Sequence, residues 1–86
     1  MIIRKEFIKR DIGGDTILVP TGTTVYDYNG LFALNELGSF LWDLLPQAEN
    51  EDALVAAVLD EYDVDEATAR QDIGEFLDKL RAMQII

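Results

Sequence analysis

The pattern of apolar and polar positions in the first third of the chain is typical of a small sheet. Two β-prone runs, residues 7–12 and 16–19, flank Gly13 and Gly14, a turn dipeptide that accepts positive φ. This arrangement predicts a β-hairpin. Pro20 is expected to end the second strand, because proline has no N–H to donate to a sheet ladder.

A third extended stretch follows the hairpin. It covers residues 25–28, breaks at Asn29-Gly30, and resumes over Leu31-Phe32-Ala33-Leu34. These residues predict the third strand of an antiparallel sheet.

After Leu34 the spacing of apolar residues changes from two to about 3.6, which indicates helices. Each of three segments opens on a residue that favours a helix N-cap: Asn35, Asn50 and Asp65. The first helix is expected to run until Pro46. The apolar stripes of the three helices comprise Leu37, Phe40, Leu41, Leu44 and Leu45; then Leu54, Val55, Val58, Leu59 and Tyr62; then Ala69, Ile73, Phe76, Leu77, Leu80 and Met83.

This order of elements predicts an α+β fold, in which a three-stranded antiparallel sheet is followed by three helices. The last two helices form a helix-turn-helix, so the arrangement resembles a winged helix. With 86 residues and no internal repeat, we expect one domain covering residues 1–86.

The composition removes most catalytic and metal-binding chemistry. The chain has no cysteine and no histidine, so it lacks thiolate ligands, disulfides and the commonest general base. We therefore expect no enzyme activity, no metal and no cofactor. The longest apolar runs span only a few residues, which predicts a cytoplasmic protein with no membrane partner.

The charge distribution argues against nucleic acid as a partner. Seven basic and seventeen acidic residues give a net charge of −10, and residues 11–69 contain no base. A nucleic-acid-binding protein needs a contiguous basic face that neutralises phosphates. We expect no such binding, despite the helix-turn-helix.

Two features suggest a binding surface. Gly74 lies within the third helix, where glycine is unfavourable, on a face that also carries Arg70, Leu77 and Arg81. Close packing against another helix would explain this glycine equally well. In addition, residues 31–34 contain neither a charge nor a proline, the usual protection of an edge strand, so a chain terminus or a partner is expected to cover them.

The residues of the first helix and its entry carry a family resemblance. The run Leu-Asn-Glu-Leu-Gly-Ser-Phe-Leu-Trp-Asp-Leu-Leu at residues 34–45 resembles the leucine-asparagine, glycine, tryptophan and double-leucine signature of the PqqD family of pyrroloquinoline quinone biosynthesis. Residues 55–65 and 72–80 are similar to the closing helices of that family, and the Gly13-Gly14 hairpin fits its opening strands. The chain departs from the family at residues 25–30, and at Gln84, where the family more often has a glycine.

The resemblance implies a peptide-binding module. Members of this family, also known as recognition elements for ribosomally made and modified peptides, hold the leader of a precursor peptide and present it to a modifying enzyme. That enzyme is often a radical S-adenosylmethionine (SAM) protein. The leader is expected to add as a strand beside the third strand, against the third helix. The candidate peptide-binding residues are therefore Leu31, Phe32, Ala33 and Leu34 on the strand, and Arg70, Ile73, Gly74, Leu77 and Arg81 on the helix.

A second reading stays open at this point. The exposed strand edge could instead belong to a generic adaptor, or to a module that pairs with its own copy as a homodimer.

Overall fold

The computed structural model describes residues 1–22, 24 and 32–86 of the chain. Three antiparallel strands are followed by three helices, which confirms the predicted α+β class. The strands are β1 (Phe7–Ile12), β2 (Asp15–Pro20) and β3 (Phe32–Leu34). The helices are α1 (Glu36–Leu44), α2 (Glu51–Glu61) and α3 (Glu66–Ala82). Leu31 and the expected extended stretch at 25–28 lie outside the described residues.

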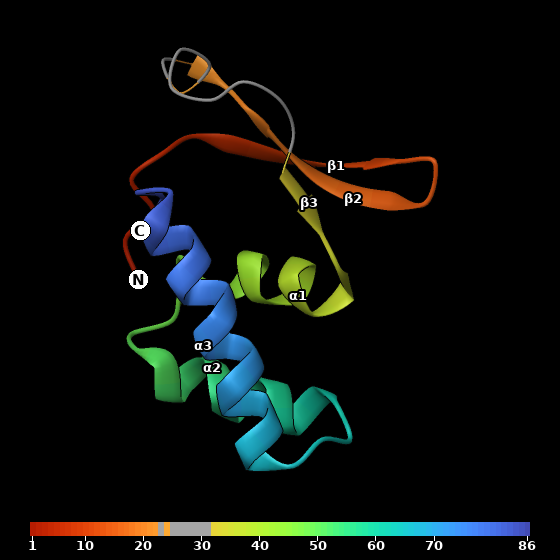
Figure 1. Ribbon diagram of the computed structural model, residues 1–86, viewed down its shortest axis with the longest axis vertical. Coiled ribbons are helices and arrows are strands. Elements are labelled where there is room, and N and C mark those ends of the chain that lie inside the picture. The colour runs from red at the N-terminus through yellow and green to blue at the C-terminus, as the bar shows by residue number, and fades with distance from the viewer. Residues whose placement is uncertain (23, 25–31) are drawn as a thin grey trace.

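The β1–β2 hairpin forms as its turn residues predict. Ile12 pairs with Asp15, so Gly13 and Gly14 make a two-residue turn, and both have positive φ, at 58° and 88°. Turns with positive φ at both central positions match the twist of the flanking strands. The hairpin extends away from the helices (Figure 1), and Ile12 near its tip is 57% exposed.

All three helices begin at the predicted caps. The side chains of Asn35, Asn50 and Asp65 accept hydrogen bonds from the backbone N–H three residues later, at 2.7, 3.0 and 2.8 Å respectively. Each bond satisfies an N–H that the first turn of a helix cannot pair internally.

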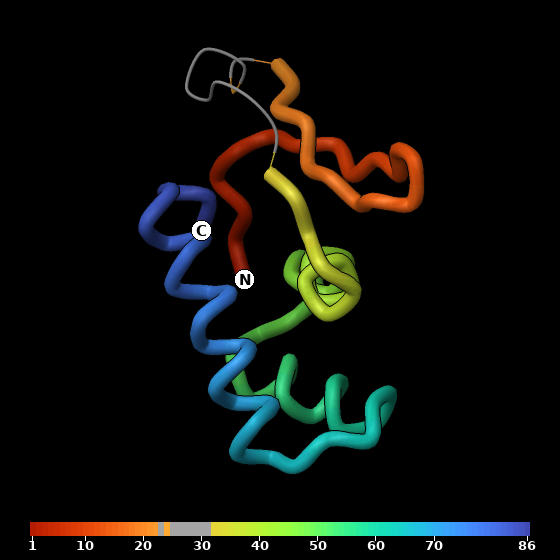
Figure 2. The backbone as a smooth tube through the Cα atoms, turned by 45° about the vertical axis from the view of Figure 1, so that its right-hand side comes forward, coloured from red at the N-terminus to blue at the C-terminus, as the bar shows by residue number. Residues whose placement is uncertain are grey.

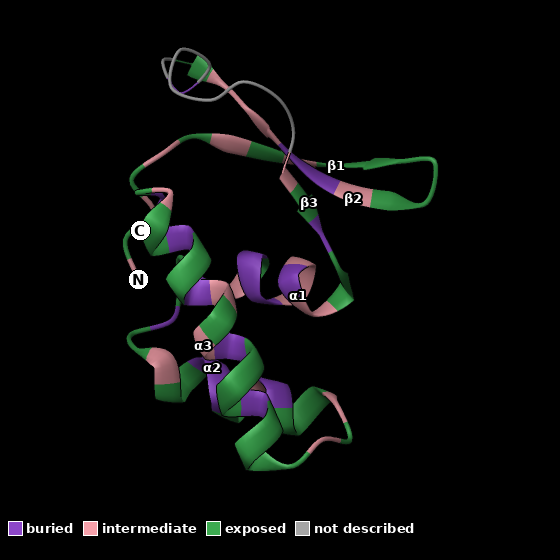
Figure 3. Cartoon of the chain, viewed as in Figure 1, coloured by how far each residue is buried: buried purple, intermediate pink, exposed green. Residues whose placement is uncertain are grey.

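The core lies where the three helices meet the inner side of the sheet (Figure 3). Leu18 from the central strand β2, Leu41 from α1 and Ile85 from the C-terminal tail are fully buried within it. The predicted stripe of α2 is correct for Leu54, Val55 and Val58, but Leu59 is 37% exposed. The remaining fully or almost fully buried residues of the helices are Leu45, Ala69, Ile73, Leu77 and Leu80.

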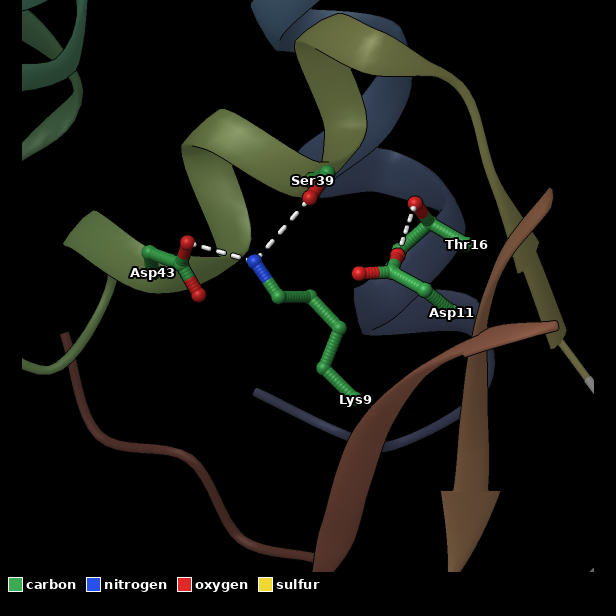
Figure 4. Close-up of polar contacts among 5 residues, drawn as sticks. All are labelled: Lys9, Asp11, Thr16, Ser39 and Asp43. Atoms are coloured by element: carbon green, nitrogen blue, oxygen red, sulfur yellow. Dashed lines mark hydrogen bonds and ion pairs between the residues drawn. The ribbon is translucent and has the colours of Figure 1, made fainter. Parts of the chain in front are cut away.

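Contacts across the sheet, the helices and the two chain ends fix their relative positions. Lys9 on β1 reaches α1, where its ammonium donates to Ser39 Oγ at 3.0 Å and contacts Asp43 Oδ2 at 2.5 Å (Figure 4). The backbone N–H of Arg4 donates to the carbonyl of Ile85 at 2.6 Å, so the two ends of the chain lie side by side (Figure 1). These contacts hold the hairpin against α1 and the N-terminal segment against the C-terminal tail.

Candidate functional site

The third strand has an unpaired side that faces α3. The order of strands is β1-β2-β3, and β3 pairs with β2 through the register Thr16↔Leu34, Ile17↔Ala33 and Leu18↔Phe32. Among the described residues, no further strand lies on the other side of β3. Within the part of the chain that the structure describes, no strand pairs with the backbone N–H and C=O groups on that side, so another extended chain could pair with them.

A groove of about 310 Å³ separates this edge from the third helix. Figure 2 shows β3, in yellow, leading into α1, while α3, in blue, runs on the opposite side of the N-terminal segment in this view. The residues that line the groove come from β3, from α1 and its N-cap, and from α3. Its lining residues are Phe32, Ala33, Leu34, Asn35, Leu37, Gly38, Leu41, Asp72, Glu75, Phe76 and Lys79.

The floor of the groove is shaped by a glycine on α1. Gly38 is buried, and a Cβ placed on it would lie 3.4 Å from Phe76 Cε1 and 3.1 Å from Asn35 Oδ1. The backbone N–H of Gly38 also donates to that same Asn35 oxygen. Glycine at this position therefore lets α1 approach α3 closely while keeping the cap of α1 intact.

One end of the groove is marked by an aromatic ring and a cation. Lys79 Nζ lies 5.2 Å from the centre of the Phe32 ring, a cation–π arrangement that links α3 to β3. Towards the other end, Phe76 meets Gly38, and Asp72 lies one helical turn further along α3. The groove is thus apolar at its floor and charged along the α3 side.

The structure places the predicted site residues in two different environments. Phe32, Ala33 and Leu34 line the groove, whereas Leu31 is outside the described residues. The five residues predicted on α3 lie elsewhere, since Ile73 and Leu77 are fully buried in the core. Arg70, Gly74 and Arg81 do not line the groove either.

The predicted Arg70 and Gly74 face of α3 points towards α2. Arg70 Nη1 donates to Asp52 Oδ1 at 2.9 Å, which raises the pKa of the arginine. A Cβ on Gly74 would meet Glu51 Oε1 at 3.7 Å, and Arg81 pairs with Asp78 of its own helix. The expectation that this face and β3 form two walls of one cleft is therefore corrected.

The helical residues that do line the groove were missed from the sequence. Asp72, Glu75, Phe76 and Lys79 flank the core stripe on one side, and Arg70 and Gly74 flank it on the other. Helical periodicity identifies the stripe, but not which flank faces the sheet. The signal in the sequence was Phe76, a large apolar residue at the margin of the stripe, which the structure leaves only partly buried.

A comparison with known protein families assigns the chain to one of them. Residues 16–86 match the family described as coenzyme PQQ synthesis protein D (PqqD). The chain therefore belongs to the PqqD family, as the signature at residues 34–45 predicted.

A solved structure with the same fold contains a bound peptide. TbiB1 in complex with the TbiA(beta) leader peptide is 27% identical to this chain, with a TM-score of 0.73. The match covers 99% of this chain and 93% of the TbiB1 chain. No curated protein sequence gives a significant match.

Proposed function

We propose that this protein is a non-catalytic recognition module that binds the leader segment of a ribosomally made precursor peptide. The observation that carries the proposal is the unpaired edge of β3, which faces α3 across an open groove. Membership of the PqqD family and the likeness to TbiB1 with its leader peptide support the same function.

The groove suits strand addition. In this mode the backbone of an edge strand supplies hydrogen bonds, and pockets for alternate side chains of the ligand supply selectivity. Phe32, Leu37 and Phe76 offer partly exposed apolar surface to such side chains. Phe32, Ala33 and Leu34 are thus proposed as the peptide-pairing strand, and the α3 wall is assigned to Asp72, Phe76 and their neighbours.

The proposed role of the protein is to present the bound leader peptide to a modifying enzyme. A module of 86 residues without histidine or cysteine offers few groups for catalysis, so the chemistry is assigned to a separate modifying enzyme. A radical SAM protein is the type of enzyme that the family resemblance suggests. Since ribosomes make the precursor, the proposed encounter takes place in the cytoplasm.

Hydrogen exchange on peptides selected for binding would test the proposal. Random peptides of about 14 residues are displayed and selected against the full chain, and the amide exchange of the protein is then measured with and without a recovered peptide. We expect new protection at residues 32–34, because a paired edge strand exchanges more slowly. The β1 edge at residues 7–12 is the internal control and should not change.

The same experiment separates leader binding from self-pairing. Protection of residues 7–12 instead of 32–34 would contradict the proposed site. If residues 32–34 became protected simply by raising the protein concentration, with a parallel rise in mass by sedimentation, the homodimer reading would be favoured instead.

A further inference from the structure

The α3 side of the groove carries charges that would select the ligand. Asp72, Glu75 and Lys79 are all exposed and all line the groove, around the partly buried Phe76. Residues three and four apart are neighbours on a helix surface, so these side chains form one continuous row. A peptide lying on β3 would face this row along its length.

The two carboxylates of the row have no cationic partner among the described residues. Glu75 accepts one long hydrogen bond, 3.4 Å, from the amide of Gln71, and no ion pair involves Asp72. The nearby bases are engaged elsewhere, since Arg70 pairs with Asp52 and Lys79 lies over Phe32. A cation supplied by the ligand would therefore relieve the repulsion between the carboxylates.

The order of charges along the groove gives the ligand a direction. Lys79 lies at the Phe32 end, and the carboxylates follow towards α1. From Glu75 to Lys79 the helix rises about 6 Å, at about 1.5 Å per residue. Side chains on the same face of a strand are about 6.7 Å apart, which corresponds to two residues. The row on α3 thus matches alternate side chains of an extended peptide.

The charge of the whole chain favours the same chemistry. With a net charge of −10, the protein repels an acidic peptide over most of its surface and attracts a basic one. Of the two arginines that would have favoured an acidic leader, Arg70 is paired across to α2 and Arg81 is paired with Asp78.

We propose that the groove selects a leader strand with a lysine or arginine opposite Asp72 and Glu75 and an acidic residue two positions away, opposite Lys79. This inference rests on the proposed function and adds the chemical class of the ligand. The carboxylates bind the basic side chain through charge-assisted hydrogen bonds, and Lys79 fixes the direction of the strand.

The test is a display selection with charge-reversed variants. Random peptides of about 14 residues are selected in parallel on the wild type, on D72K/E75K, on K79E and on D60K/E61K. The last variant is the matched control, because it changes the net charge by the same amount as D72K/E75K but alters exposed acids on α2, outside the groove. Circular dichroism verifies that each variant is folded.

We expect the wild type and D60K/E61K to enrich the same pattern, a base and an acid two residues apart. Peptides enriched on D72K/E75K should lack the base of this pattern, and peptides enriched on K79E should lack the acid. A wild-type peptide titrated into D72K/E75K should bind at least about tenfold more weakly, since two partly exposed charge pairs are reversed. If D72K/E75K fails to fold, the nearly isosteric D72N/E75Q takes its place, with an expected loss of about threefold or more.

The outcomes distinguish this inference from the proposed function. Peptides that protect residues 32–34 but show no charge pattern, or the same pattern on D72K/E75K, would overturn the inference and leave leader binding intact. A pattern lost equally on D60K/E61K would also overturn it, because the effect would then follow net charge alone. Failure of every recovered peptide to protect residues 32–34 would overturn both.

Discussion

Gln84 has a left-handed backbone conformation that residues other than glycine rarely adopt. It has a φ of 60°, and it is the single non-glycine residue with positive φ among those described. Its N–H donates to the carbonyl of Arg81, and that of Ile85 donates to Leu80, so α3 ends in a Schellman motif. In such a motif the left-handed position usually carries glycine.

Replacing Gln84 with glycine is expected to raise the free energy of unfolding by about 1 kcal/mol. Glycine relieves the strain of the left-handed conformation, which stabilises the folded state. Its larger conformational entropy in the unfolded chain offsets part of this gain. Urea unfolding would measure it. Ala56→Gly is the matched control, because this exposed position within α2 should lose about 1 kcal/mol from the same type of change. A neutral or destabilising Gln84→Gly variant would show that the strain is relieved elsewhere.

Asp65 makes stability depend on pH. Hydrogen bonds from the side chain and then the backbone of Thr68 lower the pKa of this carboxyl below its ordinary value. A group with a lowered folded pKa contributes stability above its unfolded pKa, about 3.9 for aspartate, and loses it as the pH falls through the folded pKa. The cap of α3 should therefore weaken in acid.

Thermal melts of the wild type and of Asp65→Asn, measured from neutral pH down to acid pH, would test the cap. Asparagine caps a helix about as well but does not titrate, so the wild type should melt higher at neutral pH. The difference should vanish in acid, once Asp65 is protonated. Asp63→Asn, which replaces an exposed acid in the same loop that caps no helix, is the control for the loss of one negative charge. A constant difference between wild type and Asp65→Asn at all pH values would contradict this account.

At the scale of elements, local chemistry was sufficient to predict most boundaries. Gly13 and Gly14 specified the hairpin turn, and Asn35, Asn50 and Asp65 specified three helix starts. These features depend on residues close together in the sequence, and so the sequence alone reveals them. The unprotected strand edge was also predictable, since it follows from the absence of charge and proline at residues 31–34.

The rotation of α3 about its axis could not be predicted in the same way. Ala69, Ile73, Leu77 and Leu80 form the buried stripe, but α2 lies on one flank of it and β3 on the other. The choice between the flanks depends on how α1 packs at Gly38, a contact between residues far apart in the sequence. The groove wall was therefore assigned to the wrong side of the helix.

The position of Gly74 against α2 leads to a prediction about stability and binding. A methyl group at this position would make ordinary contact with the end of the Glu51 side chain, at 3.7 Å. Gly74→Ala should thus stabilise the protein by about 1 kcal/mol, because alanine is the better helix former. Peptide affinity should stay the same, as the residue faces α2 and not the groove.

Phe76→Ala provides the contrast for Gly74→Ala. It removes an apolar lining side chain and should weaken binding of a selected peptide by about tenfold, the effect of losing one partly buried aromatic contact. Calorimetric titration with the same peptide would compare the two variants. If Gly74→Ala folds but binds the peptide more weakly, the peptide-binding site lies on the Arg70 and Gly74 face of α3, as first predicted from the sequence.

At the scale of the whole molecule, shape and charge point to different partners. The α2–α3 arrangement is a helix-turn-helix, a motif that places its second helix in the major groove of DNA. Here that second helix opens on Glu66, and Arg70 in its second turn is paired with Asp52. Over the described residues, moreover, no helix has the length and apolar character to cross a bilayer.

The charges of the molecule lead to the last prediction, which concerns duplex DNA. Binding requires bases that neutralise phosphates, yet the chain carries −10 overall, and Lys9, Arg70 and Arg81 are each paired with a carboxylate. We expect no measurable affinity at about 150 mM salt, either for random duplexes or for a genomic fragment library, by fluorescence anisotropy. D60K/E61K is a useful control, because weak binding by this variant at low salt would show that charge, and not shape, limits the interaction. Wild-type binding that survives about 200 mM salt would contradict the prediction, since contacts to base edges would then have to outweigh the repulsion.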